Sequence, residues 1–395
     1  MFEDSYSSTH PPLPPTTEDD RVSWLRLLRS RRVGVATFWR LMGEHGTAQD
    51  ALAALPEVAR AAGVAKYEIC PEGVVLAEMK AARIKGARMI CLGDPHYPPD
   101  LAQLSDAPPI LWVIGDPQVL SRPMVALVGA RNASSLGLRM ARTLAEGLSE
   151  AGYAVASGLA RGIDTAAHLA ALKGGTVATM AGGVDVLYPS ENTRLGEQIT
   201  EEGGARISEQ PMGLQPIARH FPTRNRIVSG LSRAVVVVEA AAKSGSLITA
   251  RNALDQGRDV MAVPGHPLDA RAGGCNILIR DGARLVRGVE DVIEGLPPLD
   301  MPLQPELNLR TPEKPATAPV VAFPAPPPER RSLQDVSKLH NQILARLGPS
   351  PLAEDQLIRD LGAPSGAVSP VLTDLEIEGR IQRQPGGLLS LIVSR

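Results

Sequence analysis

The spacing of hydrophobic residues divides the chain into regions of different secondary structure. Between Met124 and about Gly295, short apolar runs alternate with stretches of helical spacing. The runs are Val125–Val128, Tyr153–Ala156, Thr176–Met180, Ala205–Ser208, Ala234–Val238 and Val260–Val263. Apolar runs without alternation are typical of strands buried on both faces, and helices between them indicate parallel crossovers. The pattern therefore predicts a doubly wound α/β sheet, to which Leu111–Ile114 adds an edge strand.

The segments around this sheet differ from it in pattern. Residues 20–85 show helical spacing, with Asp20 as a candidate N-cap, and the order helix, glycine-containing turn, helix resembles a helix-hairpin-helix or SAM-type module. Contact with DNA backbone and plain helical packing both stay open for it. After the sheet, residues 333–395 read as three helices and a glycine-turned hairpin, which is the order of a winged helix.

Two segments are predicted to lack a packed core. Residues 1–19 are acidic and rich in proline and threonine, and we expect a disordered tail. Residues 297–332 are rich in proline and predict a semi-extended linker. The sheet domain then spans residues 86–296.

Composition limits the classes of function. The formal net charge is -2, which excludes a protein that binds nucleic acid simply by being basic, so a polyanion site must be a local cluster. Most of the 41 basic residues are arginines, whose planar fork grips phosphate, although a coding bias explains their number equally well. Aromatic residues make up only 3% of the chain, which argues against an extended platform for stacked bases.

The cysteines and the N-terminus indicate a cytoplasmic protein. Cys70, Cys91 and Cys275 are far apart and form no CxxC pair, so we predict neither a disulfide framework nor a metal site. The sequence has no export signal and no apolar run of about 18 residues, the length that crosses a membrane.

Small and basic residues follow the predicted strands. In an open parallel sheet, ligands bind beyond the carboxyl ends of the strands. Gly129 allows a tight turn there, the amides of the following helix suit a phosphate, and Arg131 adds a full charge. The candidate contacts from the first three strand ends are Gly129, Ala130, Arg131, Ser157, Gly158, Arg161, Gly162 and Gly182.

The later strand ends continue this pattern. Arg224 and Arg226 flank Asn225 at an expected helix start, where they can clamp phosphates while Asn225 reads an amide or a base edge. A salt-bridged helix cap is the equally open alternative. Ser244, Gly245 and Ser246 expose amides, with Ser246 as the helix cap. So many such loops together favour a long anionic ligand.

The acidic and histidine residues in these loops allow several interpretations. Asp164 and His168 stand at i and i+4, so they are an acid-base pair, one edge of a metal site, or a pair that fixes the loop by hydrogen bonds. We favour the structural role and predict no metal and no catalytic residue. Glu239 is likewise assigned a structural, loop-fixing role, in which it either caps the next helix or pairs with an arginine. Because the sequence contains neither G-x-G-x-x-G nor G-x-x-x-x-G-K-[ST], we predict no cofactor.

These motifs, in this order, resemble the DprA/Smf family of DNA-processing proteins. The resemblance covers about residues 85–290. It rests on Val-Gly-Ala-Arg131, Ser157-Gly-Leu-Ala-Arg-Gly-Ile-Asp-Thr-Ala-Ala-His168, Tyr-Pro189, Ser-Glu209, Phe221-Pro-Thr-Arg-Asn-Arg226, Val-Glu-Ala240, Ser244-Gly-Ser-Leu-Ile-Thr-Ala250, Ala-Val-Pro-Gly265 and Gly-Gly-Cys-Asn276.

The resemblance implies a Rossmann-like domain that binds single-stranded DNA, loads the recombinase RecA onto it and forms a homodimer. It implies a role in natural transformation, that is in competence and homologous recombination. It carries DNA contacts onto Arg131, residues 157–161 and residues 224–226, with Lys173 as a further candidate. Relatives often have Thr or Ser where this chain has Ala130, so one hydroxyl contact is missing here.

Two other functions stay open beside this non-enzymatic one. The sheet is also similar to Rossmann-like nucleotide phosphoribohydrolases, which carry a Pro-Gly-Gly-x-Gly-Thr loop and a nearby Glu. This chain has Ser244-Gly-Ser-Leu-Ile-Thr249 there and no Glu just after it, which argues against N-glycosidic chemistry. The third hypothesis is an adaptor whose flanking modules recruit partners, because the third winged-helix segment ends in Glu376-Ile-Glu378 rather than in basic residues.

Overall fold

The computed structural model describes residues 14–64, 66–297, 342–347 and 352–361, and in the last segment residues 368, 371, 372, 375, 380–384 and 388–391. The chain divides into two compact units, residues 1–305 and 306–395, and each is described by itself. The linker prediction lies outside the described residues except at Pro297. Residues 14–19, predicted as part of the tail, are described and include the first residues of a helix.

Four helices form the N-terminal module. They are α1 (Glu18–Arg29), α2 (Val35–His45), α3 (Ala48–Ala61) and α4 (Glu72–Ile84). The prediction that Asp20 caps the first helix is wrong by three residues, because Thr17 is the N-cap. The Thr17 hydroxyl accepts a hydrogen bond from the Asp20 amide at 3.1 Å, and the Asp20 carboxylate accepts one from the Thr17 amide at 3.1 Å. This reciprocal pair is a capping box.

A nine-stranded sheet follows, with the order β1-β2-β6-β5-β4-β3-β7-β8-β9. The strands β3 to β8 that the valine-rich runs predicted pair in parallel, whereas β1 and β2 run antiparallel to their neighbours. The predicted edge strand is β2, which lies between β1 and β6 rather than at the edge. The strands are β1 (Arg88–Cys91), β2 (Ile110–Gly115), β3 (Met124–Gly129), β4 (Ala154–Ser157), β5 (Thr176–Thr179), β6 (Ala205–Ser208), β7 (Ala234–Glu239), β8 (Asp259–Ala262) and β9 (Arg284–Leu285).

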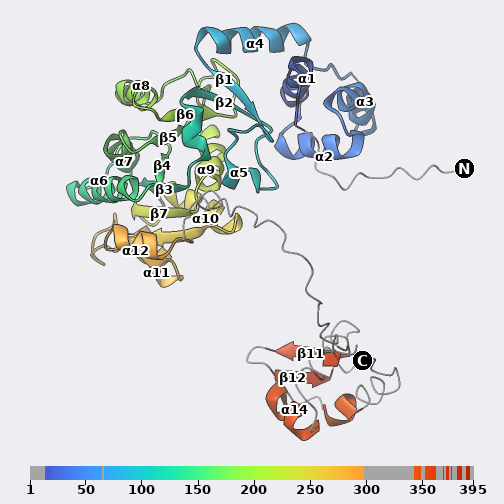
Figure 1. Ribbon diagram of the computed structural model, residues 1–395, viewed down its shortest axis with the longest axis vertical. Helices are drawn as coiled ribbons and strands as arrows, with labels where there is room; N and C mark the ends of the chain where they lie inside the picture. Colours follow the sequence, from blue (N-terminus) through green and yellow to red (C-terminus); the bar gives the residue numbers. More distant parts are fainter. Residues whose placement is uncertain are drawn as a thin grey trace, which may run out of the picture. The chain divides into compact units, whose positions relative to one another are not determined.

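Helices cover both faces of this sheet (Figure 1). On one face lie α6 (Ser135–Glu150), α7 (Ile163–Ala171), α8 (Thr193–Glu201) and α12 (Val289–Glu294), and on the other α5 (Pro99–Ala102), α9 (His220–Gly230), α10 (Ser246–Asp255) and α11 (Gly273–Arg280). Side chains alternate between the two layers: Val125 and Leu127 pack with α6 and α7, whereas Ala126 and Val128 pack with α9 and α10. This arrangement confirms the doubly wound sheet.

The N-terminal module and the sheet share one hydrophobic core. Trp112 of β2 is buried in the same cluster as Trp24 and Phe38. The Trp112 indole donates to the Glu78 carboxylate at 2.9 Å, and the Trp39 indole donates to the Ala107 carbonyl at 2.8 Å. The helical module is therefore packed against the β1–β2 end of the sheet.

The second unit contains a small antiparallel sheet and helices. Its described elements are a helical stretch at residues 342–346, β10 (Leu352–Ala353), α14 (Glu354–Leu361), β11 (Ile381–Gln384) and β12 (Leu388–Leu391). The strands follow the order β10-β12-β11. The predicted second helix and hairpin are present, and β10 is a strand that the pattern did not predict. In the described part of the chain, no helix combines the length and apolar character needed to cross a membrane.

Candidate functional site

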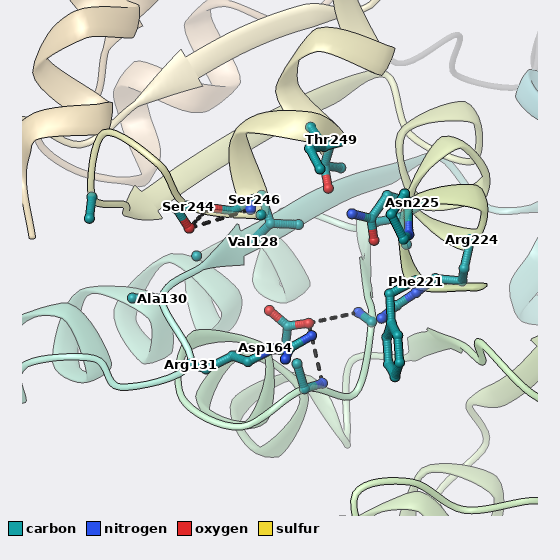
Figure 2. A pocket seen from close by; sticks show the side chains of 18 of the residues that line it. Val128, Ala130, Arg131, Asp164, Phe221, Arg224, Asn225, Ser244, Ser246 and Thr249 are labelled. Carbon is teal, nitrogen blue, oxygen red and sulfur yellow. Dashed lines mark hydrogen bonds between the residues drawn. The ribbon is translucent and has the colours of Figure 1, made fainter. Parts of the chain in front are cut away.

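A cavity of about 620 Å³ lies at the carboxyl ends of the central strands. Because β3 to β8 are parallel, the loops that follow them gather at one edge of the sheet. The end of β3 and the loops after β3, β4 and β7 line the cavity together with α9 and α10 (Figure 2). We call it the strand-end cavity. Nine of the predicted contact residues line it: Gly129, Ala130, Arg131, Gly158, Arg224, Asn225, Ser244, Gly245 and Ser246.

A smaller cavity of about 260 Å³ adjoins it. It shares Arg131, Phe221 and Arg224 with the strand-end cavity and adds the predicted Arg161. The Arg131 guanidinium lies 5.4 Å from the Phe221 ring centroid, and the Tyr188 ring lies 5.7 Å from that of Phe221. The low aromatic content argued against an extended platform for stacked bases. Two of the few aromatic rings nevertheless lie where the two cavities meet.

Arg224 is the buried cation of the site. Its side chain reaches the cavity from α9 with only 6% of its surface exposed. A Cβ atom at position 158 would lie 1.6 Å from Arg224 Nη1, so only glycine at 158 leaves room for the guanidinium. Burial lowers the pKa of Arg224 to about 10, while the nearby charge of Asp164 acts in the opposite direction. Arg224 Nε has no hydrogen-bond partner among the described residues.

Asp164 and His168 hold the β4–α7 loop. The Asp164 carboxylate accepts from the amides of Gly158 at 3.1 Å and Ala160 at 3.3 Å (Figure 2). His168 Nε2 accepts from the Leu159 amide at 3.4 Å, and His168 Nδ1 lies 2.7 Å from the Thr176 hydroxyl. Burial lowers the pKa of His168 to about 3, so the ring is neutral. These bonds match the loop-fixing interpretation, and the described residues hold no group of three or more potential metal ligands.

Two predicted helix caps are wrong. Glu239 neither caps α10 nor pairs with an arginine: its carboxylate accepts from the amide of Ser134 at 3.0 Å and from the Ser134 hydroxyl, at the start of α6. Ser246 is the first residue of α10 rather than its N-cap, which is Gly245. The Ser244 hydroxyl accepts instead from the Ser246 amide at 3.4 Å.

Four of the other predicted residues lie outside both cavities. Ser157 is fully buried, and its hydroxyl donates to the Leu127 carbonyl at 2.7 Å. Gly162 starts α7 with φ of 79° and packs against the Ala130 carbonyl, and Gly182 packs against Leu214. Lys173 is exposed just after α7, at the amino-terminal edge of the sheet. Ser157, Gly162 and Gly182 therefore pack beneath the loops without lining a cavity. Lys173 lies at the edge of the sheet opposite to these loops.

Arg226 also faces away from the cavity. The segment Phe221–Arg226 was expected to open a helix, and α9 begins next to it, at His220, so both arginines lie inside the helix. Within a helix, residues two apart point in nearly opposite directions. Arg226 therefore pairs with Glu209 and donates to the Asp106 carbonyl at 2.7 Å, on the side of the N-terminal module. This is a correction to the prediction that Arg224 and Arg226 form one clamp.

Several lining residues were missed by the sequence reasoning. They are Asn132, Phe221, Lys243, Thr249 and Arg271. Lys243 had a usable signal, since it is one of few lysines and directly precedes the predicted Ser244 loop. Thr249 had none, because only the pitch of α10 turns its side chain toward the cavity.

Comparisons with known proteins agree with this architecture. The model of the family described as DNA recombination-mediator protein A matches residues 88–297. The DprA-like N-terminal HHH domain matches residues 18–81, and the DprA winged helix domain matches residues 325–387.

Individual relatives cover most of the chain. Protein Smf of Escherichia coli is 39% identical over 299 residues, which are 75% of each chain. DNA processing protein DprA of Streptococcus pneumoniae is 46% identical over 202 residues, 51% of this chain and 71% of that one. The X-ray structure of the Streptococcus pneumoniae protein superposes with a TM-score of 0.52 and 35% identity, covering 68% of this chain and 99% of that one. The predicted fold class is thereby confirmed, and the chain belongs to the DprA/Smf family of DNA recombination-mediator proteins.

Proposed function

We propose that this protein binds single-stranded DNA and that the strand-end cavity holds part of its sugar-phosphate backbone. One observation carries the proposal. Arg131, Arg224 and Lys243 line the same cavity, and none of them forms an ion pair with a described carboxylate. Unpaired cations gathered in one place supply the local charge that a chain of net charge -2 needs to attract a polyanion.

The surroundings of these cations favour a single strand over a duplex. Phe221 and Tyr188 offer ring faces at the boundary of the two cavities, and unpaired bases stack on such rings without regard to sequence. A duplex keeps its bases stacked inside and gains nothing from them. The names of the relatives, DNA processing protein DprA, agree with a DNA ligand.

We extend the proposal to the loading of RecA during recombination and transformation, in a cytoplasmic homodimer. What supports this finer role is the description of the family as recombination-mediator proteins. Loading is measured as the rate at which RecA assembles on single strands coated with single-strand-binding protein. We expect acceleration by the wild type and none by the Arg131→Ala/Arg224→Ala double variant. No acceleration by the wild type would remove RecA from the proposal and leave DNA binding intact.

We further propose that the protein is not an enzyme. Asp164 is the carboxylate among the residues lining the strand-end cavity, and it already accepts two backbone amides. Glu239, another buried carboxylate at the strand ends, is held by Ser134 and lines a different cavity. Neither carboxylate is placed to attack a sugar, so the arrangement favours binding.

The test is an anisotropy titration of the full chain with single- and double-stranded oligonucleotides at two salt concentrations. We expect tighter binding of the single strand. Arg131→Ala and Arg224→Ala should each weaken it, and each should flatten the plot of log affinity against log salt by about 0.7, the value for one lost phosphate contact. Arg142→Ala, an exposed arginine of α6 away from both cavities, is the matched control. Unchanged affinity in both site variants would show that the cavity is not the DNA site.

A further inference from the structure

The smaller cavity carries one negative charge among several positive ones. Arg131, Arg161 and Arg224 all line it. Glu191 is the acidic side chain among the described residues around this cavity, and its carboxylate lies 3.7 Å from the Arg161 guanidinium. A carboxylate in this place works against an anionic ligand, because like charges repel and because it engages a cation that the ligand would use.

The backbone on both sides of this ion pair is held by a buried side chain. Asn192, which follows Glu191 directly, is only 5% exposed. Its side-chain amide donates to the Leu159 carbonyl and to the Thr165 hydroxyl, both at 2.9 Å. These bonds tie the turn that carries Glu191 to the β4–α7 loop that carries Arg161. The two charged side chains are therefore placed opposite each other, and parting them requires a rotation of the side chains.

The ion pair itself contributes little to the fold. The Arg161 and Glu191 side chains are 61% and 59% exposed, and their separation of 3.7 Å is longer than a hydrogen bond. Exposed pairs of this kind stabilise proteins only slightly, since water and salt screen the attraction. Asn192 already fixes the turn, so the carboxylate of Glu191 acts mainly on whatever approaches the cavity.

We propose that Glu191 restrains the binding of single-stranded DNA by engaging Arg161. The inference rests on the proposed function, because it concerns a strand that reaches the smaller cavity. A phosphate can contact Arg161 fully only after the Glu191 carboxylate has turned away, and until then the carboxylate repels the strand. The protein therefore binds single strands less tightly than its three arginines would allow, and the restraint is weak because both partners are exposed.

The experiment measures the affinity of the full-length protein for a single-stranded oligonucleotide at several salt concentrations. Glu191→Gln keeps the shape of the side chain and removes its charge. This variant should bind about twofold to fivefold more tightly than wild type at low salt, the range expected for one exposed ion pair. The gain should shrink as salt rises, because salt screens the charge of Glu191. In an Arg161→Ala background the same substitution should gain less, since no guanidinium remains to be freed.

Glu146→Gln is the matched control, because it removes the same charge from an exposed position of α6 that lines neither cavity. It should leave the affinity unchanged, and melting temperatures show that each variant is folded. The inference is refuted if Glu191→Gln binds no more tightly than wild type, or gains as much without Arg161. If Arg131→Ala and Arg224→Ala weaken binding while Glu191→Gln has no effect, the proposed function stands and this inference falls. Failure of wild type to bind single strands would overturn both.

Discussion

The two sides of α9 carry one arginine each, and the two arginines differ in whether a carboxylate pairs with them. Arg224 faces the strand-end cavity, is 6% exposed and has no ion pair with a described carboxylate. Arg226 faces the junction with the N-terminal module, where Glu209 and Asp106 both lie within ion-pair distance. The residue type and the helix are the same, and only the partners differ.

This difference separates an arginine that is available to a ligand from a structural one. An arginine whose charge is satisfied by carboxylates holds helices and loops together and has little left for a ligand. A buried arginine without such a partner weakens the fold but is ready to accept an anion. On α9 we therefore expect the cavity side to be the one available to an anion, and the junction side to contribute more to stability.

The largest expected effect is on stability at the junction. Arg226→Ala leaves the Glu209 carboxylate, 11% exposed, without its counter-charge, and breaking such a buried pair costs about 3–5 kcal/mol of unfolding free energy. Arg224→Met should change the unfolding free energy less, because Arg224 forms no direct ion pair and only the longer-range attraction to Asp164 is lost. Urea denaturation of the two variants measures both values. Equal losses would mean that the two sides of α9 do not differ as described.

The next effect separates affinity from stability on the cavity side. A Cβ atom in Gly158→Ala would overlap the end of the Arg224 side chain, which must then move out of its place. We expect DNA affinity to fall about tenfold to a hundredfold, the value of a hydrogen bond to a charged group, with little change in melting temperature. Gly43→Ala is the control, because no described atom lies within 4 Å of a Cβ there. A loss of stability without a loss of affinity would contradict this account of Gly158.

The effect that is smallest near neutral pH appears only when the protein is acidified. Burial lowers the pKa of His168 to about 3, so the unfolded chain takes up a proton below its ordinary pKa of about 6.5 while the folded chain does not. The unfolding free energy should therefore fall as the pH falls from about 6.5 towards 3, by up to about 1.4 kcal/mol for each pH unit. His168→Gln should remove this part of the slope. Chemical denaturation at several pH values measures it, and an unchanged slope would mean that another group is responsible.

The sheet was the most predictable part of the molecule. The run Ala234–Val238 became β7, Ala234–Glu239, and the run Ala205–Ser208 became β6 with the same bounds. Such strands are buried on both faces, so their composition alone identifies them. The strand-end reasoning and the family motifs together selected nine residues that line one cavity, because loops after parallel strands share an edge.

The failures have a common physical cause. Glu239 caps α6 through Ser134, 105 residues away in the sequence, and no local pattern contains that contact. Arg224 and Arg226 were predicted to form one clamp, but inside α9 they point in nearly opposite directions, and the carboxylates that hold Arg226 come from Glu209 and Asp106, earlier in the chain. Thr249 faces the cavity because of the pitch of α10 and the packing of that helix against α9. Composition identifies an element, whereas its orientation depends on distant contacts.

The core shared by α1–α4 and the β1–β2 end of the sheet has a practical consequence for dissecting the protein. A fragment that starts after residue 85 would leave Trp112, Ile110 and Cys91 without the indole and phenyl rings that cover them. Such a fragment would expose an apolar surface, and we expect it to aggregate for reasons unrelated to DNA binding. Truncation studies of the first unit should therefore keep everything from residue 14 onward and place their cuts after residue 297.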